Sequence, residues 1–340
     1  MEEKVQKRKR EHLEISLSPQ AQTGITGFDS YRFIHNALPE IDFDEIDTSI
    51  DFLGKKLAVP FFISSMTGGV AEGEKINRNL LTVAEKHGIA MGVGSQRAAI
   101  ENSELSHLFA QKSVHSKALL FANVGAVQLN YGFTIEKYQR AVEMIDADAL
   151  ILHLNPIQEA VQAEGDRNFK NLLPRISELV NKISVPVIVK EVGFGISEDV
   201  CKRLYDAGVR FIDVAGWGGT SWSVVEGRRE KGDAQLGDLF GNWGIPTTES
   251  LQMCKSVADS RSEKLSLLAS GGVRTGLDVA KAITLGAELV GLAAPFGKAA
   301  MESGEAVELV VQRLERELKT VMFGVGAQNI AELKTIRLQK

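Results

Sequence analysis

Residues 149–159 have the sequence ALILHLNPIQE, in which an apolar run is followed by a histidine, two amides and a carboxylate. The run from Ala149 to Leu152 predicts a short buried strand, and Pro156 ends that strand and turns the chain. Polar side chains at the end of a buried strand cost free energy unless something there uses them. In a barrel of parallel strands, the carboxyl ends of the strands build the active site. We therefore interpret this stretch as the floor of a pocket and not as an ordinary polar helix cap.

The same succession of apolar strand and amphipathic helix repeats from residue 60 onward. Apolar runs predict strands at residues 61–64, 89–93, 118–122, 149–154, 186–189, 211–214, 265–269 and 289–292. Helical spacing predicts helices at 72–87, 103–115, 134–145, 172–182, 197–207 and 276–285, and a long last helix carrying Val307, Val311, Leu314 and Leu318. Because the strands are apolar throughout, both of their faces should be covered. The pattern predicts an α/β TIM (β/α)8 barrel with an N-terminal extension, and an open doubly wound sheet is the alternative.

The composition indicates a soluble, cytoplasmic chain of enzyme size. Its 340 residues are 44% hydrophobic and 24% charged, enough for one large core or two domains at most. The formal net charge of −5 argues against a nucleic-acid-binding protein, which needs a basic field. The two cysteines, Cys201 and Cys254, lack metal-ligand spacing, which predicts reduced structural thiols. No apolar run approaches the length of a membrane span, and we expect no secretory signal.

A charged arm and a connector precede the barrel. Composition alone predicts that the arm, residues 1–14, is a solvated tail. The alternative is an arm that folds over an anionic ligand, because arginine and lysine, here Arg8 and Lys9, bind phosphate. The connector covers residues 20–60, and its acidic stretch at 42–51 predicts a short hairpin or strand leading to the barrel floor.

Each predicted strand ends in glycine, hydroxyl, amide or charged residues. These endings lie at residues 64–69, 92–97, 123, 153–159, 190–191, 216–222, 270–276 and 293–295. Singly each is a common turn, but together they predict one polar pocket at the carboxyl end of the barrel. The last two endings predict a phosphate site, because Gly271 and Gly272 let the backbone approach closely and a short helix can start at 293–295. A tight turn without a ligand is the alternative.

Lys190 follows an otherwise apolar strand. A buried lysine normally has an anionic partner, because an unpaired buried charge is costly. Glu191 comes directly after it but should point to the other face, since side chains alternate along a strand. A negatively charged cofactor ring is the partner we favour, and a structural ion pair is the alternative.

The segment at 216–246 contains eight glycines and three tryptophans, Trp217, Trp222 and Trp243. A segment of this length without regular structure in a compact barrel is usually a lid or a disordered insertion, and its composition favours a lid over the pocket. Its basic residues are expected on the solvated surface: Arg228, Arg229 and Lys231. We divide the chain into the arm and connector, residues 1–59, which contribute to the substrate site, and a barrel with this lid, residues 60–340.

Taken together, these motifs resemble those of the FMN-dependent type 2 isopentenyl diphosphate isomerases. The resemblance spans nearly the whole chain, and the stretch at 153–159 with the N-terminal Arg-Lys pair is its specific part. The motif of that family leads us to expect a small residue before the paired glycines, and Trp217 stands at that position in this chain. The matching stretches are RKREHL at 8–13, SMTGG at 65–69, GSQR at 94–97, HLNPIQE at 153–159, VKEVG at 189–193, GGTSW at 218–222, SGGVR at 270–274 and AAP at 293–295.

The resemblance implies a reversible 1,3-allylic rearrangement of isopentenyl diphosphate to dimethylallyl diphosphate in isoprenoid biosynthesis. It implies FMN that is active when reduced, NADPH as the reductant, Mg²⁺, and a homo-oligomer, a tetramer or octamer, with no nucleic-acid or membrane partner. An isolated alkene is a weak base, so its protonation needs a strong acid that is close and shielded from water. No side-chain pair in the sequence supplies that acid, and the resemblance assigns the proton transfers to the reduced flavin.

The resemblance also implies roles for individual residues. FMN contacts are expected from Ser65, Met66, Thr67, Ser95, Asn123, Lys190, Thr220, Gly271, Gly272, Arg274, Ala293 and Ala294. Substrate contacts are expected from Arg8, Lys9, Ser95, Gln96, Arg97 and Gln158. Catalytic contributions are expected from Gln158, in proton removal at the allylic position, from Lys190, in stabilising the reduced flavin, and from His153 and Asn155. Glu159 is expected to hold Mg²⁺, which prefers oxygen ligands.

Two other classes of function are alternatives. An FMN-dependent oxidoreductase of the α-hydroxy-acid oxidase type would use the same barrel. Such enzymes need a histidine beside the paired glycines after the sixth strand, and residues 215–222 contain none. A non-enzymatic phosphate-binding barrel would leave Lys190, Gln158 and Glu159 buried without a use, which is costly.

Overall fold

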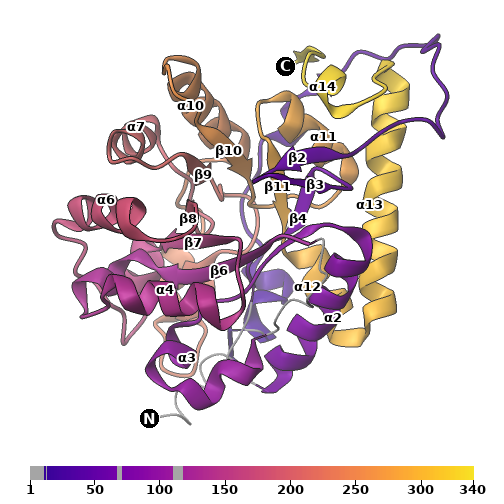
Figure 1. Cartoon of the computed structure of the whole chain (residues 1–340). Helices are drawn as coiled ribbons and strands as arrows, with labels where there is room; N and C mark the ends of the chain where they lie inside the picture. Colours follow the sequence, from indigo (N-terminus) through magenta and orange to yellow (C-terminus); the bar gives the residue numbers. More distant parts are fainter. Residues whose placement is uncertain (1–10, 13, 67–70, 110–117) are drawn as a thin grey trace.

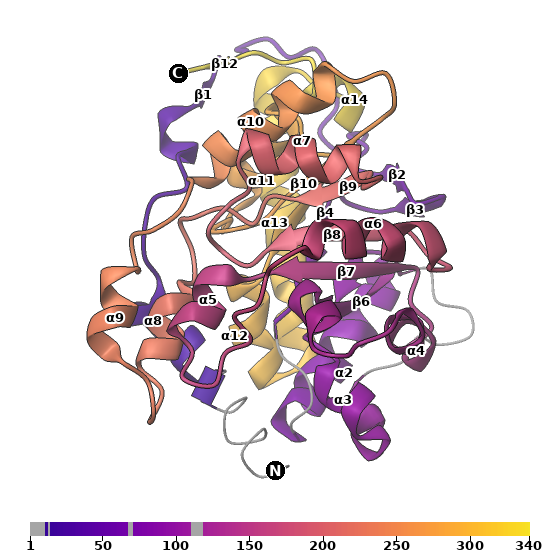
Figure 2. The same cartoon turned by 90° about the vertical axis from the view of Figure 1, so that its left-hand side faces the viewer.

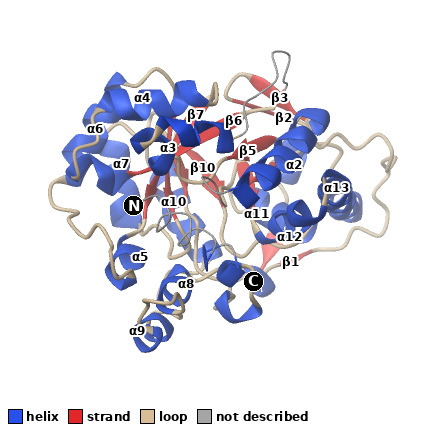
Figure 3. Cartoon of the chain, turned by 90° about the horizontal axis from the view of Figure 1, so that it is seen from below, coloured by secondary structure: helices blue, strands red, loops and turns tan. Residues whose placement is uncertain are grey.

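The centre of the structure is a closed barrel of eight parallel strands. The computed structural model describes residues 11, 12, 14–66, 71–109 and 118–340 of the chain. Figure 3 shows the strands in the middle of the molecule with helices around them. Consecutive strands are neighbours, and the last pairs with the first. The predicted barrel is confirmed, and its strands are β4 (Phe61–Ile63), β5 (Ala90–Gly92), β6 (Leu120–Gly125), β7 (Ala149–Leu154), β8 (Val187–Glu191), β9 (Phe211–Asp213), β10 (Ser266–Ala269) and β11 (Leu289–Leu292).

Helices cover the outside of the barrel (Figure 1). Ser197, the first residue of the helix predicted at 197–207, caps that helix, because its side chain accepts a hydrogen bond from the Val200 amide. The longer helices are α2 (Ala71–His87), α4 (Ile135–Met144), α6 (Leu172–Lys182), α7 (Glu198–Asp206), α10 (Thr247–Asp259), α11 (Gly276–Thr284), α12 (Ala294–Glu302) and α13 (Gly304–Val325). The shorter ones are α3 (Arg97–Glu101), α5 (Pro156–Val161), α8 (Trp222–Gly227), α9 (Ala234–Leu239) and α14 (Ile330–Leu333), with 3-10 turns at Pro19–Ala21, Phe28–Ser30, Ser103–Leu108 and Ala126–Asn130.

The predicted last helix is α13, which spans 22 residues. The four apolar residues that predict it, Val307, Val311, Leu314 and Leu318, are all buried. Their face packs against α2, α11 and α12, and Figure 1 shows α13 running along the side of the barrel beside α2. Spacing of apolar residues at the helical period thus buries one continuous stripe.

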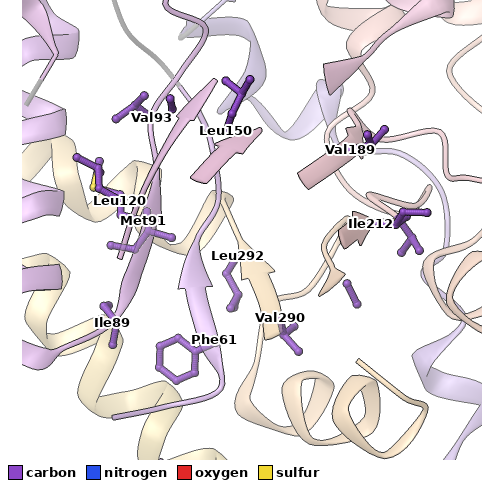
Figure 4. Packing of buried hydrophobic residues seen from close by; sticks show 14 of the residues in the cluster. Phe61, Ile89, Met91, Val93, Leu120, Leu150, Val189, Ile212, Val290 and Leu292 are labelled. Carbon is purple, nitrogen blue, oxygen red and sulfur yellow. The ribbon is translucent and has the colours of Figure 1, made fainter. Parts of the chain in front are cut away.

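The core has two layers. The outer layer lies between strands and helices, and Figure 4 shows part of it, including Phe61 on β4, Met91 on β5 and Val189 on β8. The inner layer fills the barrel with side chains of alternate strand positions, such as Phe62, Phe121 and Ile151. Because both faces of every strand are covered, the strands are apolar throughout.

A hairpin of the connector packs against the inner layer of the core. Strands β2 (Ile50–Phe52) and β3 (Lys55–Leu57) pair antiparallel, and Phe52 and Leu57 are buried in the inner layer. Burying a phenylalanine of this kind contributes roughly 1.5–3 kcal/mol. The connector does supply a hairpin to the barrel floor, but it lies at 50–57, after most of the acidic stretch that predicts it.

Several predicted elements need correction. The segment at 216–246 is not an irregular lid, because α8 and α9 form within it and α10 follows directly. The predicted helix at 103–115 is a 3-10 turn at Ser103–Leu108 preceded by α3, and residues 110–117 lie outside the described part. Short helices of this kind offer too few apolar repeats to be seen in the sequence.

The C-terminal end of the chain pairs with the connector that precedes the barrel. Strand β1 (Arg32–Phe33) pairs antiparallel with β12 (Leu338–Gln339), the last strand of the chain. Across the described residues, no helix has the length and apolar character needed to cross a bilayer.

Candidate active site

A cavity of about 420 Å³ lies at the carboxyl ends of the barrel strands. Residues after all eight strands line it, as the polar strand ends predict. The structure brings together there most of the predicted site residues: Ser65, Met66, Ser95, Arg97, Asn123, His153, Asn155, Gln158, Glu159, Lys190, Thr220, Gly271, Gly272, Arg274, Ala293 and Ala294. Arg8, Lys9 and Thr67 lie outside the described residues.

Gln96 does not line the cavity, although it is an expected substrate contact. Its side chain is buried, donates to Ala141 O at 2.8 Å and accepts from the Asn123 backbone N–H at 2.9 Å. These bonds tie the end of β5 to α4 and β6. The structure therefore corrects this expectation: Gln96 supports the wall of the site, while its neighbours Ser95 and Arg97 face the cavity.

The turn from β7 into α5 carries three polar side chains that bond to one another. Pro156 takes the first helical turn, where a missing N–H costs nothing. Asn155 Nδ2 donates to Gln158 Oε1 at 3.1 Å and to Glu159 Oε1 at 2.9 Å. Asp166 N donates to Glu159 Oε2 at 2.6 Å. Burial raises the pKa of Glu159, and these hydrogen bonds offset that effect only in part.

Glu226 on α8 completes this cluster, and sequence reasoning missed it. Gln158 Nε2 donates to Glu226 Oε1 at 2.8 Å, and Arg229 Nη1 donates to Glu226 Oε2 at 2.7 Å. His12 Nε2 lies 2.9 Å from Glu226 Oε1. Burial alone would raise the pKa of Glu226, but His12, Gln158 and Arg229 lower it to about 2. Glu226 is therefore a fixed, buried anion. The sequence does carry one indication of a buried carboxylate here, because Glu226 comes directly after the apolar pair Val224-Val225.

Arg229 also differs from expectation. It was expected on the solvated surface, yet only 8% of its side chain is exposed. It contacts Glu226, Glu164 and Glu11, and so joins α8 to the segment after α5 and to the N-terminal region. Figure 2 shows α5, α8 and α9 on one side of the barrel mouth. Lys231 is exposed, as predicted.

His153 is held as a neutral imidazole. Asn123 Nδ2 donates to Val93 O at 3.0 Å, which leaves Asn123 Oδ1 to accept from His153 Nδ1 at 2.8 Å. Burial, and then the charge of Lys190, lower the pKa of His153 to about 4. The proton therefore sits on Nδ1 at neutral pH, and Nε2 is left as an acceptor.

Lys190 has the structural ion pair that the sequence left as the alternative, and it also faces the cavity. It lines the cavity, and its Nζ donates to Glu191 O at 2.6 Å and lies 3.7 Å from Asp213 Oδ2. Asp213 is itself buried, and it accepts hydrogen bonds from the Ser270 backbone N–H and from the Ser270 hydroxyl, whose oxygen lies 2.9 Å from both carboxylate oxygens. The Glu191 carboxylate points elsewhere, as predicted, and accepts the N–H groups of the next three residues. A structural ion pair thus holds a lysine at the edge of the cavity.

The loops after β10 and β11 form a cradle of small residues. Gly272 has φ of +70°, and a Cβ there would lie 2.1 Å from Gly218 O. Gly219 faces it, since a Cβ on Gly219 would lie 2.7 Å from Gly272 N. Helix α12 starts at Ala294 with a proline in its first turn, as predicted. The half-buried guanidinium of Arg274 completes the cradle, and among the described residues it has no carboxylate side-chain partner.

Comparison with known proteins places the chain in a family. A family model described as FMN-dependent dehydrogenase matches residues 17–121 and 158–340. An isopentenyl-diphosphate delta-isomerase of Oceanobacillus iheyensis is 48% identical over 98% of this chain and 96% of its own length. One of a Nostoc species is 49% identical over 97% and 94%. The chain belongs to the isopentenyl-diphosphate delta-isomerase family.

Solved structures share the fold of this isomerase family at lower identity. A flavocytochrome b2 has a TM-score of 0.68 at 21% identity, covering 98% of this chain and 82% of its own. A mandelate oxidase has a TM-score of 0.62 at 16% identity, covering 96% and 91%. These likenesses support the barrel and carry no argument about the reaction.

The residues of the cavity fit the flavin mononucleotide that the family name FMN-dependent dehydrogenase implies. Arg274 and the glycine cradle offer a positive, close-approach site of the kind that a phosphate needs. Two buried oxygen atoms, Ser65 Oγ and Asn155 Oδ1, have no hydrogen-bond partner within the described chain, and both residues line the cavity. Buried polar atoms without partners are costly, so a polar ligand there relieves that cost.

Proposed function

We propose that this isomerase-family protein interconverts isopentenyl diphosphate and dimethylallyl diphosphate with reduced FMN as its acid–base cofactor. The observation that carries the proposal is one cavity lined both by the glycine cradle and by Gln158 and Glu159, with the buried Glu226 bonded to Gln158 outside the lining. The first suits the flavin phosphate, and the second suits a small diphosphate with its metal. FMN, when bound and reduced, supplies the proton transfer that an alkene requires.

The chain's own residues hold and shield the reactants. We assign Gln158 to proton removal at the allylic position, with its amide oriented by Asn155 and Glu226. His153 presents a neutral acceptor, Nε2, and Trp222 contributes an apolar wall that excludes water. Glu159 holds Mg²⁺, whose preference is for oxygen ligands. FMN is held by Ser65, Met66, Thr67, Ser95, Asn123, Lys190, Thr220, Gly271, Gly272, Arg274, Ala293 and Ala294.

The N-terminal segment, residues 1–59, belongs to the substrate site in this proposal. His12, Ser16 and Leu17 line the cavity, which supports that assignment. Substrate contacts come from Ser95, Arg97 and Gln158, with Arg8 and Lys9 over the diphosphate. Arg97 contacts Glu101 and Asp166, so its charge is held at the cavity edge. NADPH as the reductant, a cytoplasmic location and a homo-oligomeric state are part of the same proposal.

The test is product analysis. Purified protein is incubated with isopentenyl diphosphate, FMN, NADPH and Mg²⁺, and dimethylallyl diphosphate should appear only when the flavin is reduced. A parallel incubation with 2-hydroxy acids and an electron acceptor examines the oxidase alternative. Oxidation of a hydroxy acid without isomerisation would replace the proposal by that alternative.

Replacing Gly272 by alanine should weaken FMN binding by roughly tenfold or more. The new Cβ would contact Gly218 O in a backbone conformation that favours glycine, and the strain costs on the order of 1–3 kcal/mol. A flavin fluorescence titration measures the effect. Gly304→Ala is the matched control, because its Cβ would meet nothing within 4 Å. An unchanged FMN affinity in Gly272→Ala would remove this loop from the cofactor site.

Lys190→Ala should lower the flavin reduction potential. The substitution removes a cation and leaves the buried Asp213 carboxylate near the cofactor, which disfavours the negative charge gained on reduction. A loss of about 1.4 kcal/mol corresponds to roughly 30 mV for a two-electron couple. Lys281→Ala is the control, because this equally buried lysine donates to Phe28 O and does not line the cavity. Equal potentials in both variants would leave Lys190 a purely structural role.

A further inference from the structure

The segment at 16–26, here called the N-terminal strap, is hydrogen-bonded to the loop that follows β9. Thr23 N donates to Gly219 O at 2.9 Å, and Ser221 N donates to Ala21 O at 2.8 Å. Between them Gln22 faces Thr220 in an antiparallel bridge. The strap therefore pairs with the loop as a short extra strand, directly behind the glycine cradle.

Gln22 is the strap residue whose side chain reaches the cradle. Its Nε2 donates to Thr220 Oγ1 at 2.9 Å and to Ser16 O at 2.9 Å. Its Oε1 accepts from Arg274 Nη2 at 2.6 Å. Thr220 and Arg274 both line the cavity, whereas Gln22 does not. One amide thus fixes a hydroxyl and a guanidinium of the cradle from outside the cavity.

The Gln22 amide that accepts from Arg274 carries no charge, so it does not neutralise the guanidinium. The Arg274 guanidinium also donates to Val273 O, so its partners among the described side chains and carbonyls are uncharged. Asp278 accepts from the backbone N–H of Arg274, and its charge acts on the guanidinium only through space, without a hydrogen bond to it. Arg274 is therefore oriented but not neutralised, which is the state that a cationic anchor for a dianion requires.

We propose that Gln22 is a positioning residue of the cofactor-phosphate site, which aims Arg274 and Thr220 at the phosphate and leaves the charge of Arg274 available. The inference rests on the proposed FMN site and adds a residue outside the barrel to it. It also makes the N-terminal strap part of the cofactor site, so the segment that precedes the barrel serves the flavin as well as the substrate.

The experiment compares FMN with riboflavin, which has the same ring and lacks the phosphate. The full-length protein, freed of flavin, is titrated with each by flavin fluorescence. Gln22→Glu places a carboxylate on Arg274 and opposite the phosphate, so FMN affinity should fall roughly 10- to 100-fold while riboflavin affinity changes by less than about twofold. Gln22→Ala keeps the charge of Arg274 but loses its orientation, and should weaken FMN by roughly two- to tenfold.

Gln20→Glu is the matched control. Gln20 is exposed, lies two positions away on the same strap and bonds to Arg228 at 3.3 Å instead of Arg274. It should bind FMN like the wild type. A Gln22→Glu protein with the wild-type preference for FMN over riboflavin overturns the inference, and so does an equal loss for both flavins or an equal loss in Gln20→Glu. If Gln22→Glu does not fold, the preference in Gln22→Ala decides.

The outcomes for the proposed function are separate. A wild-type protein that binds neither flavin contradicts the FMN proposal itself. A wild-type protein that prefers FMN, with that preference unaltered in both Gln22 variants, contradicts only the role of Gln22.

Discussion

Replacing Glu159 by glutamine should leave FMN bound but reduce isomerisation by roughly two to three orders of magnitude, a loss comparable to removing one preorganised group from a transition state. The carboxylate is buried, and both of its oxygens accept hydrogen bonds, from Asn155 and from the Asp166 amide. Glutamine has almost the same shape but can accept at only one of those two positions, so the substitution removes the charge and one of the two hydrogen bonds. A neutral amide binds a hard dication more weakly, so the activity remaining should need more Mg²⁺.

The measurement is initial rate against Mg²⁺ concentration, with flavin absorbance as the check on cofactor content. Glu178→Gln removes a carboxylate from a surface ion pair on α6 and should behave as the wild type. Because burial raises the pKa of Glu159, protons should compete with Mg²⁺, and the apparent Mg²⁺ affinity should fall as the pH is lowered. Full activity of Glu159→Gln at ordinary Mg²⁺ levels would refute the metal assignment.

Replacing Glu226 by glutamine should lower kcat by roughly 100- to 1,000-fold, within the range that a positioned acid–base group contributes. Glu226 is an anion at neutral pH, since its pKa is about 2, and it receives Gln158 and Arg229 on separate oxygens. A neutral amide can accept only on one of those positions, so the Gln158 amide loses its fixed orientation. Gly271, Gly272 and Arg274 of the flavin cradle follow a different strand, β10, so FMN affinity should change little.

The control for Glu226 is Glu164→Gln. Glu164 also pairs with Arg229, but 47% of its side chain is exposed, whereas Glu226 is buried and bonds to Gln158, which lines the cavity. Exposed ion pairs contribute little, so this variant should keep kcat within about twofold. Similar losses in both variants would mean that Glu226 acts only by holding Arg229 and α8, and kcat unchanged in Glu226→Gln would remove it from the reaction altogether.

The barrel and the residues around its pocket could be predicted from the sequence, because both depend on local patterns of apolar and polar residues. Strand β7 is observed at Ala149–Leu154, the range predicted for the fourth strand, two residues beyond the apolar run that ends at Leu152. Polar residues at successive strand ends must meet when parallel strands close into a barrel, whatever the details of packing. That rule predicts that Ser65, Asn123, His153 and Arg274 lie around one pocket, and all four line the cavity.

The roles of residues whose partners lie far away in the sequence could not be predicted. Glu226 and Gln158 are 68 positions apart, and Gln22 and Arg274 are 252 apart. Spacing in the sequence carries no information about such pairs, because α8 and the strap reach the site through irregular connections. The prediction for Arg229 was wrong for the same reason. Its charge predicts a solvated position, but in the fold three carboxylates surround it.

Periodicity of apolar residues therefore predicted the α/β barrel, with an open sheet as the alternative, since hydrophobic burial follows from local spacing. The closure of the eight strands was decided by the tertiary structure. Packing in three dimensions decided which polar groups face the cavity and which support it. Gln96 and Ser95 are adjacent in sequence, yet the amide bonds to α4 and β6 while the serine lines the cavity. The physical reason is that a buried polar side chain must find a partner, and the folded chain alone determines which partner is within reach.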